Sequence, residues 1–153
     1  MKLSPNTRYA VRILFELHGT AAPISTAALS EKTGITPRTV ENIHAVLRRH
    51  KITFGTVGAG GGLELVRPLS DISLGDIITL FDDGVAFSVC CGDKSNECPN
   101  RKTCGIRSAW DAVSMAVQEQ LDAVSLESIL HRYPQDGTGF MLNTLCEDAG
   151  KPR

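Results

Sequence analysis

LSEKTGITPRTVENI, residues 29–43, is the stretch that decides the fold. A short helix over 26–32 is followed by a Thr-Gly turn. Thr36-Pro37 then supplies a capping residue and a proline at the first helical position, and a second helix is expected to run to about His50. Two helices joined by a turn of about three or four residues that contains glycine form a helix-turn-helix.

The second of these helices has two chemically different faces. Its apolar residues recur at helical spacing, so their side is expected to be buried: Val40, Ile43, Val46 and Leu47. The second helix of a helix-turn-helix presents exposed residues near its start to a DNA groove, where Arg suits guanine, Asn suits adenine and Glu suits cytosine. The candidate DNA-binding residues here are Thr36, Arg38, Thr39, Glu41, Asn42 and Arg48. The same pattern also fits a plain helical hairpin with a solvated face.

A β-hairpin is predicted directly after this unit, within ITFGTVGAGGGLELVRP, residues 52–68. Strands over 52–57 and 63–66 are expected to pair antiparallel around a glycine turn. A hairpin in this place is a wing, and the tip glycines Gly60 and Gly61 would let its backbone approach phosphates. A nucleotide-binding glycine loop is set aside because neither GxxxxGK[ST] nor GxGxxG followed by a helix is present.

Helices flank the unit on both sides. Ser4-Pro5 starts one that ends at Gly19, and Ser73 caps another over 74–81.

A longer amphipathic segment, 105–124, follows the cysteines. Its apolar residues recur at gaps of three and four, close to a heptad: Ile106, Trp110, Val113, Val117, Leu121 and Val124. A seam this long predicts a partner helix in a twofold homodimer, which recognition of DNA half-sites also needs. The alternative is that the helix packs back on its own domain. A short helix over 126–131 and a loose tail from Tyr133 complete the chain.

Four of the five cysteines lie within CCGDKSNECPNRKTC, residues 90–104. This segment has few apolar anchors, so something other than a hydrophobic core is expected to order it. Cys91, Cys98 and Cys104 are separated by six and five residues, wider than a zinc knuckle and unlike the common ferredoxin spacings. Thiolates favour iron–sulfur clusters or zinc. Surface thiols that hold no metal are the third interpretation.

Charge divides the chain into a basic and an acidic part. Residues 1–67 carry nine Lys or Arg against four Glu, a balance of +5, whereas residues 68–153 carry seven against thirteen Asp or Glu, a balance of −6. The basic part favours a polyanionic partner. Chance distribution is the alternative explanation.

A cytoplasmic protein with no membrane partner is expected. No run approaches the ~20 apolar residues that cross a bilayer. Arg8, Arg12 and Glu16 interrupt the first apolar stretch, which fits an amphipathic helix rather than a signal peptide. In the cytoplasm, clustered cysteines indicate metal or redox chemistry more often than disulfides. An enzyme is not expected, because no nucleophile–base pair or carboxylate pair has recognisable spacing.

The order of these parts resembles the family of winged-helix regulators typified by IscR, NsrR, RirA and CymR, from about Met1 to Leu130. The matching pieces are MKLSPNTRYAVRIL, LSEKTGITPRTVENI, GAGGGLELVRP, ISLGDIITLFD, the C-x6-C-x5-C spacing, and IRSAWDAV with LDAVSLESIL. Each piece alone is unspecific, but all of them in this order make a specific match.

The resemblance implies a homodimeric bacterial transcription regulator that binds an iron–sulfur cluster, [2Fe–2S] or [4Fe–4S], through three loop cysteines. Carried over by position, these ligands are Cys91, Cys98 and Cys104, with Cys90 as an additional candidate thiol.

The chain departs from the resemblance at the fourth ligand. One branch of the family uses a His three residues after the last cysteine, where this chain has Arg107. Other branches use a first-helix residue, and the corresponding Arg8 and Arg12 cannot ligate iron. The fourth position is therefore open between Cys90, a water-derived species, a small thiol and no ligand.

Two further departures concern DNA recognition. Val57 stands where family members commonly carry an Arg before the wing tip, and Thr39 stands where a Tyr is usual. Both changes predict a weaker reading of the minor groove and a different operator.

The sequence thus predicts a mainly α fold with a small β-hairpin wing. Its parts are a winged helix-turn-helix domain over 1–81, a cysteine-bearing cluster loop over 82–104, a dimerisation helix with a short following helix over 105–132, and a tail over 133–153. The predicted function is a homodimeric regulator whose binding to a double-stranded DNA operator is gated by an iron–sulfur cluster that senses redox state, NO or iron. The alternative is a cluster-free winged-helix regulator controlled by a protein partner or by thiol oxidation.

Overall fold

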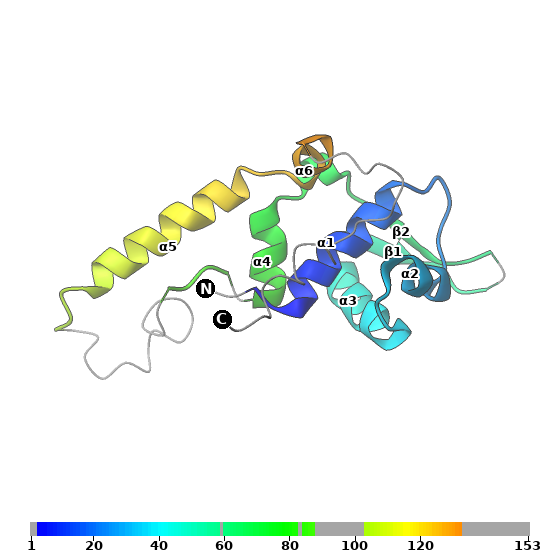
Figure 1. Ribbon diagram of the computed structural model, residues 1–153, viewed down its shortest axis with the longest axis horizontal. Coiled ribbons are helices and arrows are strands. Elements are labelled where there is room, and N and C mark those ends of the chain that lie inside the picture. The colour runs from blue at the N-terminus through cyan, green and yellow to red at the C-terminus, as the bar shows by residue number, and fades with distance from the viewer. Residues whose placement is uncertain (1–2, 59, 83, 88–102, 133–153) are drawn as a thin grey trace, which may run out of the picture.

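The computed structural model describes residues 3–58, 60–82, 84–87 and 103–132 (Figure 1). The elements in chain order are α1 (Pro5–His18), α2 (Thr26–Thr33), α3 (Pro37–Arg49), β1 (Thr53–Gly55), β2 (Leu63–Leu65), the short 3-10 helix η1 (Leu69–Asp71), α4 (Leu74–Asp82), α5 (Arg107–Asp122) and α6 (Leu126–Arg132). The prediction of a mainly α fold with a small hairpin is confirmed.

Local capping determines where the first helices begin and end. The Ser4 hydroxyl accepts a hydrogen bond from the Thr7 amide at 3.3 Å, and the Ser25 hydroxyl accepts one from the Ala28 amide at 3.2 Å. Gly34 ends α2 in the left-handed conformation, with φ of 67°, which glycine adopts without steric cost. Because these signals act within a few residues, the sequence alone locates α1, α2 and α3 closely.

The two strands pair antiparallel, as predicted, but each is three residues long and so shorter than the expected spans 52–57 and 63–66. Hydrogen bonding continues past the ladder, because the Thr56 amide donates to the Gly62 carbonyl at 2.9 Å. Beyond this bond the chain turns through Gly58, whose φ is 118°, and regular pairing ends.

A contact far away in sequence holds the wing against the rest of the domain. Ile24, in the loop before α2, exchanges two backbone hydrogen bonds with Leu63 of β2, at 3.0 and 2.8 Å. Gly62 makes this approach possible, because a Cβ at this position would lie 2.5 Å from the Ile24 carbonyl carbon. The hairpin is therefore fastened through Ile24 as well as through its own turn.

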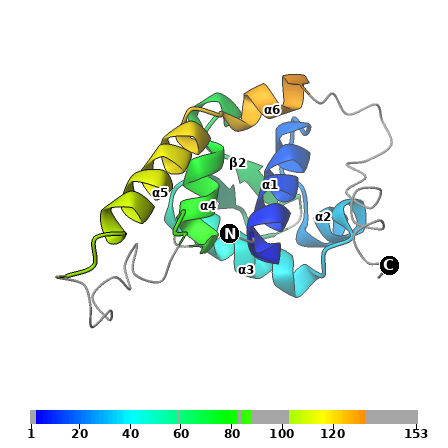
Figure 2. The ribbon, with the colours of Figure 1, turned by 60° about the vertical axis from the view of Figure 1, so that its left-hand side comes forward.

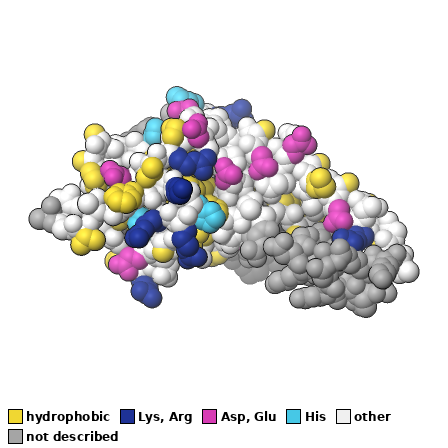
Figure 3. Space-filling view, turned by 180° about the vertical axis from the view of Figure 1, so that it is seen from behind, with side chains coloured by type: hydrophobic (Ala, Val, Ile, Leu, Met, Phe, Trp, Pro, Cys, Tyr) yellow, Lys and Arg dark blue, Asp and Glu magenta, His cyan; other side chains and the backbone are white. Residues whose placement is uncertain are grey.

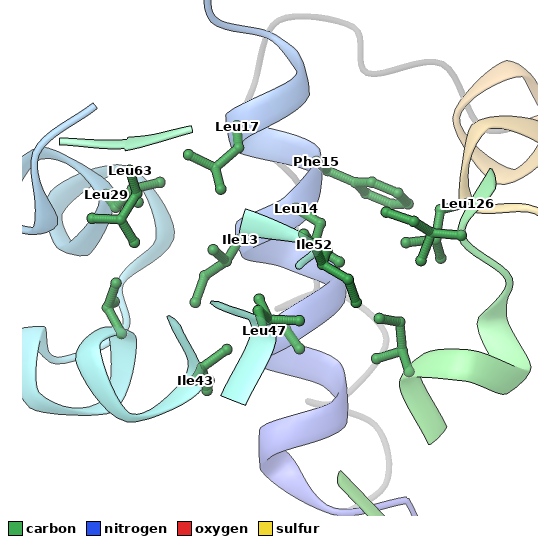
Figure 4. Close-up of a cluster of buried hydrophobic side chains, with 14 of the residues drawn as sticks. Ile13, Leu14, Phe15, Leu17, Leu29, Ile43, Leu47, Ile52, Leu63 and Leu126 are labelled. Atoms are coloured by element: carbon green, nitrogen blue, oxygen red, sulfur yellow. The ribbon is translucent and has the colours of Figure 1, made fainter. Parts of the chain in front are cut away.

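The hydrophobic core forms around α1, which contacts α2, α3, α4 and β2. Its fully buried members include Ile13 and Leu14 of α1, Ile43 and Leu47 of α3, and Leu126 of α6. Figure 4 shows Leu126 reaching this cluster from the opposite side to α3. The chain that leaves the winged half after α4 therefore returns to it at α6.

Helix α5 projects beyond the winged half and contacts α4 (Figures 1 and 2). It is shorter than the predicted 105–124, and Ser114 is its one buried residue. The start of the predicted seam is exposed to solvent: Ile106 is 60% exposed, Trp110 41% and Val113 45%. None of the helices in the described ranges is both long and apolar enough to cross a bilayer.

Candidate nucleic-acid interface

Helix α3 presents a polar face to solvent and an apolar face to the core. Of the predicted apolar stripe, Val40, Ile43 and Leu47 are buried. Val46 is half-buried. On the opposite side Arg38, Glu41 and Asn42 are exposed and lie within one turn of each other. This arrangement is the one that a recognition helix needs, because the exposed side chains can reach base edges while the other face fixes the helix on its domain.

Thr36 and Thr39, the other candidates near the start of α3, also serve the helix itself. The Thr36 hydroxyl accepts a hydrogen bond from the Thr39 amide at 3.4 Å, so Thr36 is the N-cap. The two hydroxyls lie 2.9 Å apart and share a hydrogen bond. Each hydroxyl keeps further bonding capacity, but its orientation is set by this cap.

A cleft of about 360 Å³ separates α3 from the wing. It is lined by the start of α2, by the second half of α3 and by both strands' tip residues: Ser25, Thr26, His44, Arg48, Gly55, Thr56, Val57, Gly58, Gly61, Gly62 and Leu63. The exposed Arg48 guanidinium is the cationic group of this lining. Arg48, one of the predicted DNA-binding residues, therefore lines the same cleft as the wing. Arg38 lies near the start of α3 and is not part of this lining.

His44 is a residue of this cleft that sequence analysis did not select. Its Nδ1 lies 3.0 Å from the Thr53 hydroxyl, and its ring packs so closely on Gly55 that an added Cβ would lie 2.9 Å from Nε2. Burial, and next the nearby Arg48, lower the pKa of His44. The signal in the sequence is its position one turn before Arg48, since residues spaced by four share a helix face.

The wing tip holds both predicted glycines. Gly60 is exposed and has a φ of 83°, whereas Gly61 is half-buried and its amide donates to the Gly58 carbonyl at 3.0 Å. Val57 beside them is fully exposed. The tip thus offers backbone and one apolar side chain, and no charge among the residues named.

The exposed charges of the winged half are strongly basic around α3. Arg38, Arg48, Arg49 and Lys51 are all exposed. Figure 3 shows most of the dark-blue side chains gathered over this half among a few magenta carboxylates, with further magenta carboxylates across the rest of the visible face. The charge asymmetry of the sequence is therefore also an asymmetry in space, and it favours a polyanion on the winged half.

Of the predicted cluster ligands, the structure describes Cys104, which is half-buried, carries a free thiol and lies shortly before α5. Cys90, Cys91 and Cys98 lie outside the described residues. Within the part of the chain that is described, no three His, Cys, Asp or Glu side chains come together as a metal site.

A helix-turn-helix with an exposed polar recognition face, followed by a hairpin that borders the same cleft, defines a winged-helix DNA-binding protein. The chain belongs to the Rrf2 family, described as "Iron-dependent Transcriptional regulator", whose sequence model matches residues 3–132. This finding confirms the family resemblance that the sequence motifs indicate.

Relatives and solved structures agree with this assignment. The chain is 30% identical over 132 residues to the HTH-type transcriptional regulator IscR of Sodalis glossinidius, covering 85% of this chain and 79% of that one. The structure of T. potens IscR is 28% identical, with a TM-score of 0.66 and coverage of 92% and 96%. The oxidized form of Staphylococcus aureus CymR is 26% identical, with a TM-score of 0.61 and coverage of 84% and 95%. The protein is thus a DNA-binding transcriptional regulator rather than an enzyme, as predicted.

Proposed function

We propose that this protein is a homodimeric transcriptional regulator whose binding to an operator is gated by an iron–sulfur cluster. The observation that carries this proposal is the position of the cysteines in the chain. Residues 90–104 connect the winged half, which ends with α4, to α5, whose apolar seam begins exposed. A ligand bound to this connection is therefore placed to change how one winged half lies relative to another.

Base reading is proposed for the exposed start of α3. Arg38, Glu41 and Asn42 would contact base edges, each through the hydrogen-bonding pattern of its own side chain. Thr36 and Thr39 would contact the backbone or bases through the capacity that the cap leaves free.

Backbone contact is proposed for the cleft and the wing. Arg48 at the cleft and Gly60 and Gly61 at the tip would approach phosphates, because an Arg side chain and glycine backbone both suit a phosphate oxygen. Each phosphate that a cation neutralises also makes affinity depend more steeply on salt.

Dimerisation is proposed through α5. Ile106, Trp110 and Val113 are partly exposed and lie at heptad positions that a partner helix would pack against in a coiled coil. Exposed large apolar side chains of this kind mark interaction surfaces. Half-sites on DNA lie roughly 34 Å apart, so small rotations at such a seam alter the fit to both half-sites.

The donor set fits an iron–sulfur cluster. Cys91, Cys98 and Cys104 would supply thiolates, which are the ligands that iron–sulfur clusters use, and the described member of the set, Cys104, carries a free and half-buried thiol. Cys90 is a candidate for the fourth position. When bound, the cluster would supply a redox-sensitive group whose loss or change is the signal, while the protein's own residues set its access and its charge.

Anaerobic purification tests the proposal. The protein should be coloured, contain iron, and bind duplexes selected by the iron-loaded form from a random library at least about tenfold more or less tightly after iron is removed. Cys98→Ala should lose both the colour and this difference. Cys146→Ala, which removes the one thiol outside residues 90–104, is the matched control and should keep both. A colourless, iron-free protein whose DNA affinity is unchanged by Cys98→Ala contradicts the proposal.

Thiol oxidation is the second candidate, and the similarity to an oxidized form of CymR is the observation that favours it. In that case peroxide should change the DNA affinity of iron-free protein, and the change should reverse with a reducing agent. A peroxide response that survives removal of iron separates this candidate from the first.

A further inference from the structure

Asp82, the last residue of α4, holds the first turn of α1. The Ser4 amide donates to both carboxylate oxygens of Asp82, at 3.1 and 3.2 Å, and the Thr7 hydroxyl donates to Oδ2 at 2.5 Å. Helix α1 has no acidic residue in its own first turn. Asp82 therefore supplies the negative charge that the positive end of α1 favours, from a position that is distant in the sequence.

The carboxylate suits this arrangement because it offers acceptors at both of its oxygens. Three hydrogen bonds converge on these two oxygens: the Ser4 amide donates to both of them, and the Thr7 hydroxyl donates to Oδ2. Burial of Asp82 raises its pKa, but the hydrogen bonds from Thr7 and Ser4 outweigh burial, so the pKa lies below its usual value. An amide in its place has one acceptor oxygen instead of two, so at least one of the three hydrogen bonds must be lost or reversed.

The residues just after Asp82 are attached on the other side to α5. The Val85 amide donates to Gln118 Oε1 at 3.3 Å, and the Phe87 amide donates to the Ser114 hydroxyl at 3.3 Å. Ser114 is buried, and Gln118 is itself fixed by a bond to Asp122 Oδ1 at 2.8 Å. The segment that leads from α4 toward the cysteines is thus bonded to α1 through its first residue and to α5 through its last described residues.

Helix α1 is in turn the element that positions the DNA-binding unit. It packs against α2, α3 and β2, and its residues Ile13 and Leu14 lie fully buried at the centre of the core. A change in how the segment at 82–87 is held would therefore reach the start of α1 directly, without passing through the loops of the wing.

We propose that Asp82 is a positioning residue, which passes a change of state in the cysteine-bearing segment to α1 and hence to the DNA-reading half. The inference rests on the proposed function for the origin of the signal at the cysteines. The attachment itself, between the end of α4 and the start of α1, is independent of any cofactor.

Asp82→Asn tests the inference, and Asp76→Asn is its matched control. Asp76 lies in the same helix and also accepts a backbone amide, but from Ser73 at 2.9 Å, which is a cap within α4. In the full-length protein, Asp82→Asn should raise amide hydrogen exchange at Ser4 and Thr7 about tenfold, whereas Asp76→Asn should leave it unchanged. Unchanged exchange in Asp82→Asn would overturn the attachment.

DNA affinity tests the coupling. The ratio between the dissociation constants of iron-loaded and iron-free protein should fall toward one in Asp82→Asn and keep its wild-type value in Asp76→Asn. Asp82→Asn with the full wild-type ratio overturns the inference. If the wild-type protein itself shows no ratio, the proposed function fails, and the exchange measurement still decides whether Asp82 holds α1.

Thr7 provides a second route if Asp82→Asn does not fold. Thr7 is buried, and Thr7→Val keeps its shape while removing the hydroxyl that bonds Asp82. Thr7→Val should reproduce the faster exchange at Ser4 and the smaller affinity ratio, and Thr7→Ser should restore both. Both single changes affect the Thr7–Asp82 hydrogen bond, so the effects of the double variant on exchange and on the affinity ratio should be smaller than the sum of the two single effects. Fully additive effects would contradict the inference.

Discussion

The imidazole Nδ1 of His44 on α3 and the hydroxyl of Thr53 on β1 lie 3.0 Å apart and share a hydrogen bond. Thr53 is buried, and the same ring packs against the neighbouring Gly55. The proposed recognition helix α3 and the wing beside it are therefore connected by a side chain that can be titrated.

Acidic pH should weaken the contact between His44 and Thr53. The pKa of His44 is lowered by burial and by Arg48, so the folded protein binds a proton at His44 less readily than the unfolded chain does. The stability that neutral His44 contributes is fully present above the unfolded value of 6.5 and is lost as pH falls through the lower folded value. The difference in unfolding free energy between wild type and His44→Asn, measured in urea, should shrink from pH 7.5 to pH 5. His50→Asn, at an exposed position, is the matched control for this substitution.

Gly62→Ala should detach the wing from the loop before α2. A methyl group at this position overlaps the backbone of Ile24, so the two hydrogen bonds between Ile24 and Leu63 cannot both persist. We expect a loss of about 2–4 kcal/mol in the free energy of unfolding. Gly105→Ala, which has no atom within 4 Å of an added Cβ, should stay within about 0.5 kcal/mol of wild type. Equal effects of the two variants would contradict the packing described.

Lys51→Gly should stabilise the protein. Lys51 follows α3 with a φ of 55°, in the left-handed region where a side chain is disfavoured and glycine is not. We expect the free energy of unfolding to rise by about 0.5–1 kcal/mol. Lys51→Ala removes the same charge and keeps the strain, so it separates the two effects. Stabilisation by Lys51→Ala to the same extent would mean that charge, and not backbone strain, is the cause.

Leu126→Ala should destabilise the winged half, although Leu126 lies beyond α5. The side chain is fully buried in the core that α1 organises. Its truncation should lower the free energy of unfolding by about 2–5 kcal/mol in thermal or urea denaturation. Val57→Ala, at a fully exposed position, is the control and should change stability by less than about 0.5 kcal/mol.

The Asp82 carboxylate predicts a second dependence of stability on pH, in a more acidic range. Because its folded pKa lies below the unfolded value of 3.8, the stability that it contributes is present above pH 3.8 and disappears as pH falls through the folded value. The stability difference between wild type and Asp82→Asn should therefore be constant near neutral pH and narrow below pH 3.8. A difference that widens on acidification would contradict the hydrogen-bonded carboxylate.

The parts that sequence predicts well are those set by neighbouring residues. Ser25, Gly34 and Thr36 act within one turn of themselves, so they locate the helix-turn-helix without knowledge of its surroundings. Contacts between residues that are distant in the sequence cannot be predicted from such local signals. The Ile24–Leu63 pairing and the bonds of Asp82 to α1 depend on which surfaces meet, and hydrophobic periodicity identifies a buried face without naming what buries it.

The residues of the candidate site likewise differ in how well the sequence predicts them. The exposed face of α3 follows from its amphipathic pattern, so Arg38, Glu41 and Asn42 could be chosen from sequence. For His44 the sequence gives only its position one turn before Arg48, because its contact with Thr53 depends on the strand that packs on it. The cysteine ligands remain a prediction, carried by spacing and by the family.

The return of the chain to the core at Leu126 has an evolutionary consequence. The chain leaves the winged half at Asp82 and returns to it at Leu126, so both ends of the intervening segment are attached to the same winged half. Adding residues between fixed ends costs little, about 0.6 kcal/mol for each doubling of length. The segment between these two residues can thus change in length during evolution at little cost in folding free energy, while the core that holds α3 and the wing stays the same.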